Sequence, residues 1–424
     1  MSHIAIVTLP LVGHLNPMGA LAESLMERGH RVTVVGPPGV CALARTHMKG
    51  AQVHALSDLD YPSDRLDHFL GLLPGIKGLS GIRAVIAEIA ALSALYLRAL
   101  PAALETLDAD CVLHDQLEPA AGVVARGLGL AHASVACALP MNREPRLPPP
   151  YLGWPYRDSP WWRSLYGGAY LVIDRMMAEQ NALLDSAARD YGFRARNVSD
   201  CVSANCDLSQ CIPGFDYPRT VSPAHVGLRD VGPLRRRRPL SRLDFERDGR
   251  ELVFCSLGTI MGGRLDLFEA VVEACSANVV QCIIAHAGRL TSQEEAKLRA
   301  LPGHPIVRDF VDQRAVLSES RAAVLHGGFN SVLDALSAGV PMVVLPLAFE
   351  QAAIASRVDR AGTGIVVRRP SPKRLRQAVG EALNSRELRQ AALGLARAAS
   401  LAGGATDAAR RVEATINDRQ KVSA

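Results

Sequence analysis

His326-Gly327-Gly328-Phe329-Asn330-Ser331 is the stretch of sequence that decides the fold. The apolar run from Arg321 before it predicts a short buried strand, and the residues from Asn330 onward have helical periodicity that Gly339-Val340-Pro341 ends. Two glycines between a strand and a helix let the backbone turn sharply and approach a ligand closely. Free N–H groups and the positive end of the helix dipole then point at the turn, with side-chain donors from His326, Asn330 and Ser331. The stretch therefore predicts a cradle for phosphates.

A similar strand, loop and helix opens the chain. Ile4 to Leu9 is apolar and is followed by the loop Pro10 to Pro17, the helical stretch Met18 to Arg28 and the strand Arg31 to Val35. This β–loop–α–β unit predicts the start of a doubly wound parallel sheet. Such sheets place their chemistry in the loops at the carboxyl ends of strands, which makes His14 a candidate functional residue.

A histidine base works best when a carboxylate holds its other ring nitrogen. Asp115 follows the predicted strand Ala109 to His114 and should lie at the same edge of the sheet as His14. Glu118 is the runner-up, although Pro119 directly behind it indicates an acid at a helix start. Asp115 is therefore the expected partner of His14.

The stretch 310–351 and the motif Gly13-His14-x-Asn16-Pro17 resemble the nucleotide-sugar glycosyltransferases of glycosyltransferase family 1. The resemblance implies the α/β architecture called GT-B, which consists of two facing doubly wound, Rossmann-like domains with a cleft between them. It also implies an inverting enzyme in which His14 is the general base and Asp115 steadies the imidazolium. No metal and no cofactor is expected, because UDP-glucose is a co-substrate.

The same resemblance assigns the donor. It places Phe310 on the uracil face, Gln313 and Asp334 at the ribose, and Glu350 with Gln351 at the sugar hydroxyls. Phe310 stands where plant members carry tryptophan, so stacking is retained but weaker. Glu350 stands where aspartate is commoner, which leaves the identity of the hexose open, with glucose expected. The expected donor-binding residues are Gly258, Thr259, Phe310, Val311, Gln313, His326, Gly327, Gly328, Asn330, Ser331, Asp334, Glu350 and Gln351.

The 424 residues are enough for two domains. We expect an N-terminal acceptor-binding domain over 1–233, an interdomain linker over 234–249 and a C-terminal nucleotide-sugar-binding domain over 250–400. Residues 401–424 should form a helix that returns to the N-terminal domain. The run Arg235 to Arg238 predicts a solvated basic linker, with attraction to anionic lipid as the alternative. A net charge of +5 is small for this length and does not indicate a nucleic-acid partner.

Nine cysteines, an odd number, scatter through strand-like segments, which fits reduced thiols in a cytoplasm. Cys201, Cys206 and Cys211 lack the two-residue spacing typical of metal sites. The pairs Asp58–Asp60 and Asp108–Asp110 match a two-aspartate metal motif of another glycosyltransferase fold, but so short a pattern arises by chance. No metal site is expected.

The chain enters a strand directly after Met1-Ser2-His3, without the features of a signal peptide. Its most apolar helical stretch, Ile82 to Leu104, contains Arg83, Glu88, Arg98 and Pro101. Such interruptions favour one or two amphipathic helices over an apolar cleft and argue against a transmembrane helix. We expect a cytoplasmic protein, with peripheral contact at the inner membrane surface as a further possibility.

The acceptor has to be held by the N-terminal half, which is apolar over 66–73, 82–97 and 154–171. The segment Ala136 to Pro145, with the Pro148-Pro149-Pro150 run after it, resembles the branch of the family that glucosylates carotenoids such as zeaxanthin. The resemblance implies a lipophilic acceptor with a hydroxyl, most simply zeaxanthin or a related xanthophyll.

Three other functions stay open. A macrolide, flavonoid or other natural product is the alternative acceptor. A non-catalytic nucleotide-sugar-binding subunit should have lost a base like His14, and a nucleotide-sugar 2-epimerase should lack the motif around it.

Overall fold

The computed structural model describes residues 1–57, 61–73, 78–220, 227–348 and 350–423. Two sheets organise these residues, and all strand pairs within them are parallel. The N-terminal sheet has the order β3-β2-β1-β4-β5-β6-β7. Its strands are β1 (His3–Val7), β2 (Arg31–Gly36), β3 (Gln52–Ala55), β4 (Cys111–Asp115), β5 (Ala131–Ala136), β6 (Asp207–Ser209) and β7 (Arg229–Asp230).

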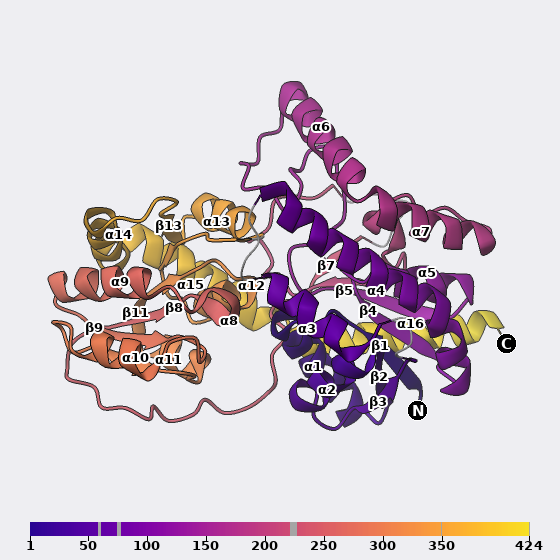
Figure 1. Ribbon diagram of the computed structural model, residues 1–424, viewed down its shortest axis with the longest axis horizontal. Helices are drawn as coiled ribbons and strands as arrows, with labels where there is room; N and C mark the ends of the chain where they lie inside the picture. The colour runs from indigo at the N-terminus through magenta and orange to yellow at the C-terminus, as the bar shows by residue number, and fades with distance from the viewer. Residues whose placement is uncertain (58–60, 74–77, 221–226, 349, 424) are drawn as a thin grey trace.

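The helices of this half cover both faces of the sheet, as in a doubly wound fold (Figure 1). Strands β1 and β4 are buried along their whole length, which fits the apolar residues Ile4 to Val7 and Cys111 to Leu113. The helical elements are α1 (Val12–Glu27), α2 (Pro38–His47), α3 (Ser63–Leu72), α4 (Gly78–Thr106), α5 (Pro119–Gly127), α6 (Pro160–Met176), α7 (Ala178–Asp190) and the 3₁₀ helix η2 (Val198–Cys201).

The C-terminal sheet has the order β10-β9-β8-β11-β12-β13 and repeats the same design. Its strands are β8 (Leu252–Ser256), β9 (Gln281–Ala285), β10 (Ile306–Arg308), β11 (Ser320–Leu325), β12 (Met342–Val344) and β13 (Gly364–Val366). Its helices are α8 (Gly258–Met261), α9 (Leu265–Ala277), α10 (Ser292–Arg299), α11 (Gln313–Ser318), α12 (Phe329–Ser337), α13 (Gln351–Arg360), α14 (Pro372–Asn384) and α15 (Arg386–Leu401).

Each sheet has a point where the strand order reverses, and the candidate residues lie there. In the first sheet β1 pairs with β4, with Val7 opposite His114, so the segments that follow these two strands are neighbours. In the second sheet β8 pairs with β11, with Ser256 opposite Leu325. Ligands of doubly wound sheets bind at such switch points. The topology therefore brings His14 near Asp115, and the turn after β11 near the segment after β8.

The two halves share apolar packing and buried polar contacts. Leu139, Ile212 and Phe215 of the first half belong to the same buried cluster as α12 and α13 of the second. Arg357 in α13 forms an ion pair of 2.6 Å with Asp216, and both side chains are at most 5% exposed. The last helix, α16 (Gly404–Ser423), packs against α1 and β5 of the N-terminal sheet. Figure 1 shows it, in yellow, running back across to the first half.

One helix differs from the expectation, and another agrees with it. The first begins at Val12 and includes Pro17, whereas the sequence predicted a loop as far as Pro17. The apolar stretch predicted as one or two helices is the single helix α4, with Pro101 inside it. By length and composition Ser80–Thr106 could cross a membrane. However, α4 packs on α5 and α7, and its Tyr96 and Leu100 are fully buried in the N-terminal core.

Candidate active site

His14 lies in the first turn of α1, directly after β1, and its side chain meets Asp115 at the end of β4. The distance from Nδ1 to the Asp115 Oδ2 is 2.6 Å, and the side chains are 11% and 1% exposed. An ionised carboxylate only accepts hydrogen bonds, so Nδ1 carries a proton, and in the neutral ring Nε2 keeps its lone pair. Among the described residues Nε2 has no hydrogen-bond partner. The pair therefore has the arrangement of a histidine base held by a carboxylate.

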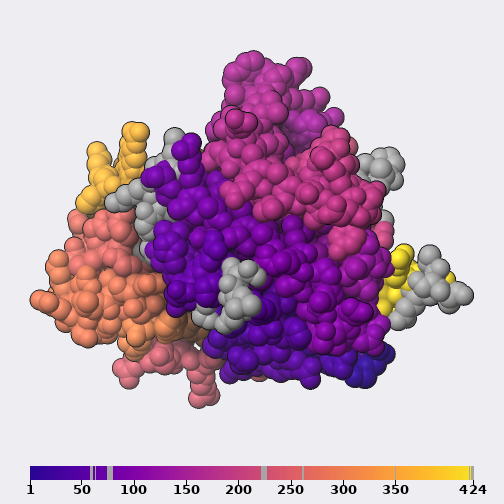
Figure 2. Space-filling view, turned by 45° about the vertical axis from the view of Figure 1, so that its right-hand side comes forward, coloured from indigo at the N-terminus to yellow at the C-terminus, as the bar shows by residue number. Residues whose placement is uncertain are grey.

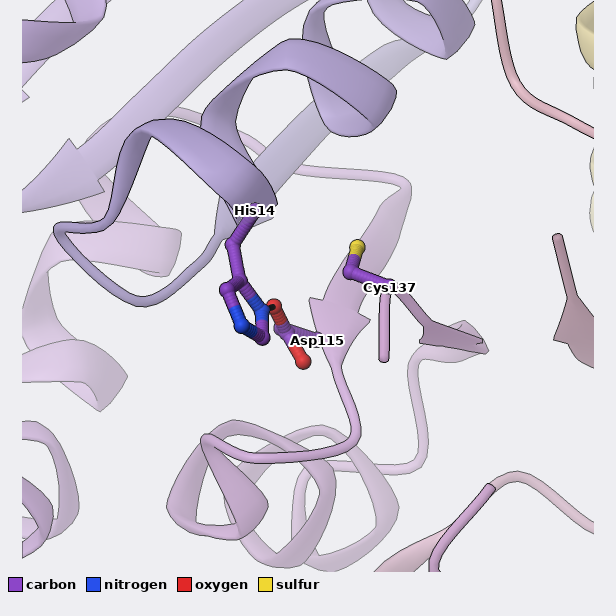
Figure 3. Close-up of side chains that lie close together, drawn as sticks. All are labelled: His14, Asp115 and Cys137. Atoms are coloured by element: carbon purple, nitrogen blue, oxygen red, sulfur yellow. Dashed lines mark hydrogen bonds and ion pairs between the residues drawn. The ribbon is translucent and has the colours of Figure 1, made fainter. Parts of the chain in front are cut away.

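Asp115 accepts hydrogen bonds from other groups besides His14. The backbone N–H of Leu117 donates to Oδ1 at 2.9 Å, and the Thr8 hydroxyl donates to Oδ2 at 3.4 Å. Burial raises the pKa of Asp115, but the His14 charge and the hydrogen bonds of His14, Leu117 and Cys137 lower it more, so its net pKa lies below the usual value. Figure 3 shows His14 and Cys137 at this carboxylate. Asp115 is therefore ionised at neutral pH.

His14 has the opposite shift. Burial lowers its pKa, while the charge and hydrogen bond of Asp115, with a smaller effect from the Glu350 carboxylate, raise it above 6.5 overall. The Asp115 carboxylate thus favours the imidazolium, which is the form a base reaches after taking a proton.

Glu118, the runner-up, has a different environment. It is fully buried, and the Ser93 hydroxyl donates to it at 3.2 Å. Burial raises the pKa of Glu118 to about 8, so it is mostly protonated at neutral pH. It forms no contact with His14 in the described part of the chain. The geometry therefore favours Asp115.

Glu350 comes from the C-terminal half, at the start of α13, and faces His14 closely enough for the two charges to act on each other. Burial raises the pKa of Glu350, and the effect of His14 partly offsets this. The predicted base and the predicted sugar-binding acid therefore lie together although 336 residues separate them in the sequence. Gln351, beside it, accepts hydrogen bonds from the backbone N–H groups of Leu347 and Ala348 at 2.8 and 2.9 Å.

The turn after β11 places the His326 ring between two glycines. A Cβ on Gly258, where φ is +76°, would lie 2.6 Å from the ring, and one on Gly328 would clash with its Nε2. Burial lowers the pKa of His326 to about 4, so the ring is neutral at physiological pH. It can donate one hydrogen bond to a phosphate but brings no charge. Helix α12 starts at Phe329 without a side-chain cap, which leaves its first N–H groups for a ligand.

The two residues expected at the ribose bond to each other, and Ser331, which was expected at the phosphates, bonds to one of them. Gln313 donates through Nε2 to the Asp334 Oδ2 at 2.7 Å, and the Ser331 hydroxyl donates to the Gln313 Oε1 at 3.1 Å. Phe310 is 69% exposed, a state suited to stacking on a base. Val311, next to it, is partly buried. Thr259 is exposed, and its carbonyl accepts a hydrogen bond of 2.7 Å from Arg289.

Asn330 does not point its side chain into the phosphate turn as expected. Its Nδ2 donates to the Gly13 carbonyl at 2.7 Å, and its Oδ1 accepts from Gln210 at 3.1 Å. The reason lies in α1: Pro17 has no N–H for the carbonyl four residues earlier, which is that of Gly13. The Asn330 amide from the other domain supplies that missing donor.

The arginine run is also different from the solvated linker predicted for it. Arg235 donates to the Asp334 Oδ1 at 2.6 Å, and Arg236 pairs with Glu23 at 2.8 Å. Leu234, the first residue of the predicted linker, is only 1% exposed and belongs to the N-terminal core. Only Arg237 and Arg238 are exposed. The sequence predicts four consecutive arginines to be solvated, because no local pattern shows that carboxylates distant in the chain, Asp334 and Glu23, pair with two of them.

The remaining candidates from the sequence are the two aspartate pairs and the cysteines. Asp58–Asp60 lies outside the described residues, and Asp110 accepts a hydrogen bond of 2.7 Å from the His3 backbone. All nine cysteines are free and buried, including the three spaced at five residues. His14, Asp115 and Cys137 are close enough to hold a metal ion. Burial raises the pKa of the Cys137 thiol well above its usual value, and the thiol donates a hydrogen bond to Asp115.

Comparison with known proteins agrees with this architecture. The family model "Erythromycin biosynthesis protein CIII-like, C-terminal domain" matches residues 272–414. A zeaxanthin glucosyltransferase of Pantoea ananas is 34% identical over 427 residues, which cover 100% of this chain and 98% of the relative. That of Pseudescherichia vulneris is 32% identical over 433 residues and covers 100% of both chains. The crystal structure of the kitacinnamycin glycosyltransferase is 25% identical, covers 98% of this chain and 99% of its own, and superposes with a TM-score of 0.75.

The two parallel sheets, with their switch points facing the shared interface, define a GT-B glycosyltransferase. The chain belongs to the family of nucleotide-sugar glycosyltransferases that includes the zeaxanthin glucosyltransferases of these two bacteria.

Proposed function

We propose that the protein transfers glucose from UDP-glucose to a hydroxyl of a lipophilic acceptor, a xanthophyll such as zeaxanthin, with inversion at the anomeric carbon. The observation that carries the chemistry is the 2.6 Å contact between His14 and Asp115, opposite the Glu350 carboxylate. The choice of acceptor rests on the two full-length relatives named for zeaxanthin.

In the proposed reaction, the His14 Nε2 takes the proton of the acceptor hydroxyl, and Asp115 stabilises the imidazolium. The acceptor oxygen attacks the anomeric carbon as the bond from that carbon to the diphosphate breaks on the opposite face. The electron pair leaves with UDP, where the N–H groups of α12 and a hydrogen bond from neutral His326 stabilise the charge. His14 then returns its proton to water. No metal ion and no bound cofactor takes part in this scheme.

A lipophilic acceptor has support from the N-terminal half. Helix α6 stands out from the body of the molecule, at the top of Figure 2 in magenta. Its outward side chains include Trp161, Leu171 and Val172, which are 65%, 71% and 62% exposed. Exposed apolar side chains gathered on one helix mark a contact with a partner or a lipid surface. We therefore propose that a cytoplasmic enzyme touches the inner membrane surface through α6, and not through the arginine linker.

The segment Ala136 to Pro145, which resembles the carotenoid-glucosylating branch of the family, helps to hold α6 in place. Asn142 donates to Asp207 at 2.6 Å, Arg143 holds Asp174 through two hydrogen bonds of 2.8 and 2.6 Å, and Glu144 accepts from the Thr220 backbone. Because Asp174 lies in α6, Arg143 ties this helix to the acceptor side of the site.

The test is incubation with UDP-glucose and a panel of hydroxylated carotenoids, macrolides and flavonoids, with products identified by mass spectrometry. We expect zeaxanthin to gain one or two hexoses and to react faster than the other acceptors. Faster turnover of a macrolide or a flavonoid would move the assignment to the natural-product branch. UDP binding without any transfer would indicate a non-catalytic subunit.

The membrane contact has its own test. Trp161→Ser combined with Leu171→Ser should weaken binding to anionic vesicles and slow turnover of vesicle-embedded zeaxanthin several-fold. Leu401→Ser is the matched control, because Leu401 is 86% exposed but lies in α15, outside α6. Equal vesicle binding by the two proteins would reject α6 as the contact.

A further inference from the structure

The backbone that carries Arg235 is fixed to the N-terminal domain. Leu234, directly before it, is 1% exposed in the N-terminal core. The backbone just upstream is held on two sides: Gly232 N–H donates to the Cys211 carbonyl at 3.0 Å, and Gly404 N–H donates to the Val231 carbonyl at 2.8 Å. The side chain of Arg235 therefore starts from a rigid base and not from a flexible linker.

The guanidinium of Arg235 reaches across to the C-terminal domain and binds acceptors of both halves. Nε donates to the Asp334 Oδ1 at 2.6 Å, Nη1 to the Gln210 Oε1 at 2.9 Å, and Nη2 to the Asn330 carbonyl at 3.1 Å. The Arg235 and Asp334 side chains are 20% and 10% exposed, so the ion pair is largely shielded from water. Several directed contacts of this kind need the planar fork of arginine, which a lysine ammonium cannot reproduce.

Hydrogen bonds extend this contact in both directions. Toward the proposed nucleotide-sugar site, Asp334 accepts a hydrogen bond of 2.7 Å from Gln313. On the other side, Gln210 donates to the Asn330 Oδ1 at 3.1 Å, and Asn330 donates to the Gly13 carbonyl at 2.7 Å. Gly13 is the residue before His14. An unbroken chain of hydrogen bonds thus runs from the residues proposed for the ribose to the turn that carries the proposed base.

We propose that Arg235 is a positioning residue that couples the donor ribose site to the placement of His14. The inference rests on the proposed function, because the ribose assignment of Asp334 and Gln313 comes from it. The guanidinium orients the Asp334 carboxylate, whose remaining lone pairs receive the ribose hydroxyls. Through Gln210 it also fixes the side chain of Asn330, which holds the first turn of α1. Donor affinity and turnover therefore depend on one side chain that touches neither the sugar nor the acceptor.

The first experiment compares Arg235→Ala with Arg237→Ala, the matched control two residues along the same run. Arg237 is exposed and forms no hydrogen bond or ion pair within the described residues. We expect Arg235→Ala to weaken UDP binding, measured by calorimetry, about tenfold and to lower kcat about tenfold, since it removes hydrogen bonds to a charged group. Arg237→Ala should match the wild type in both. UDP affinity and kcat unchanged by Arg235→Ala, whatever its melting temperature, would overturn the proposal.

Arg235→Lys separates charge from geometry and also serves if the alanine variant does not fold. The ammonium can still pair with Asp334, so UDP affinity should stay within about threefold of the wild type. It cannot hold Gln210 and Asn330 as well, so kcat should remain low. Full kcat in Arg235→Lys would overturn the coupling to His14.

Wild-type protein distinguishes failure of this inference from failure of the proposed function. Wild type that binds UDP and glucosylates an acceptor, with Arg235→Ala behaving identically, rejects the inference alone. Wild type that binds no UDP rejects the ribose assignment and the proposed function together.

Discussion

The pair His14–Asp115 and the pair Gln313–Asp334 are both polar contacts near the domain interface, but they are built differently. The first has one histidine on one carboxylate, fixed by the pairing of β1 with β4 within a single sheet. In the second, Asp334 has both oxygens engaged, by Gln313 of the same domain and by Arg235 of the other half. The two side chains of the catalytic pair thus come from one domain, whereas the ribose acid is held by side chains of both. A carboxylate that only holds the base, such as Asp115, can be fixed within one domain. A carboxylate that binds a ligand, such as Asp334, has to keep lone pairs free for the ribose.

The largest effect should come from removing the base. His14→Ala should lower kcat by about 10²–10⁴-fold, the usual contribution of a general base, because it removes the nitrogen proposed to take the proton of the acceptor hydroxyl. UDP affinity should change little, since His14 pairs with Asp115 on the acceptor side and is not one of the residues proposed to bind the nucleotide. Steady-state kinetics together with calorimetry check both. Near-full turnover would remove His14 from the mechanism.

Asp115→Asn tests the same pair through the pH dependence of kcat/KM. We expect a loss of kcat of the same order, with the fold intact by circular dichroism. In the wild type the Asp115 carboxylate holds the pKa of His14 above 6.5, and only the neutral ring can accept a proton, so kcat/KM should fall as pH drops through that raised pKa. Without the carboxylate the His14 pKa falls, and the acidic limb should move to lower pH. If this variant is silent, Glu118→Gln becomes the next test of the partner.

A smaller effect is expected on the donor side. Gly258→Ala places a Cβ 2.6 Å from the His326 ring at a φ of +76°, so either the ring or the backbone has to move. UDP affinity should fall about tenfold, roughly the value of one hydrogen bond to a charged group. Gly263→Ala is the control in the same segment, since its Cβ would meet no atom closer than 3.5 Å. Equal UDP affinity in both variants would contradict a role for His326 at the diphosphate.

The smallest effect should follow metal removal. EDTA should leave turnover of UDP-glucose within about twofold, because the α12 N–H groups and His326 are proposed to meet the charge of the leaving diphosphate. Turnover before and after chelation, with Mg²⁺ or Mn²⁺ added back, measures this. An absolute requirement for a cation would return attention to Asp58–Asp60 or Asp108–Asp110 and would count against the whole site.

The pairing of His14 with Asp115 could be predicted because it needs only local information. Each residue follows a buried strand, and parallel strands end at one edge of their sheet. The same logic explains why Gly258 lies beside His326, because each follows one of two paired strands. Cys137 and Gln210 were missed, since a cysteine and a glutamine after a strand carry no signal that separates a site residue from a core residue.

The sequence by itself determined the two parallel sheets, the family, and the strand ends at which the candidate residues lie, because apolar periodicity and glycine turns are encoded over short spans. Only the tertiary structure decided which polar groups meet across the domains. Pro17 removes the N–H that the Gly13 carbonyl would use within α1, but nothing in the sequence says that Asn330 replaces it. Likewise Arg235 is one of four consecutive arginines, and its difference from Arg237 arises because its backbone anchor points it at Asp334, 99 residues away. Contacts of that range depend on how two finished domains pack together.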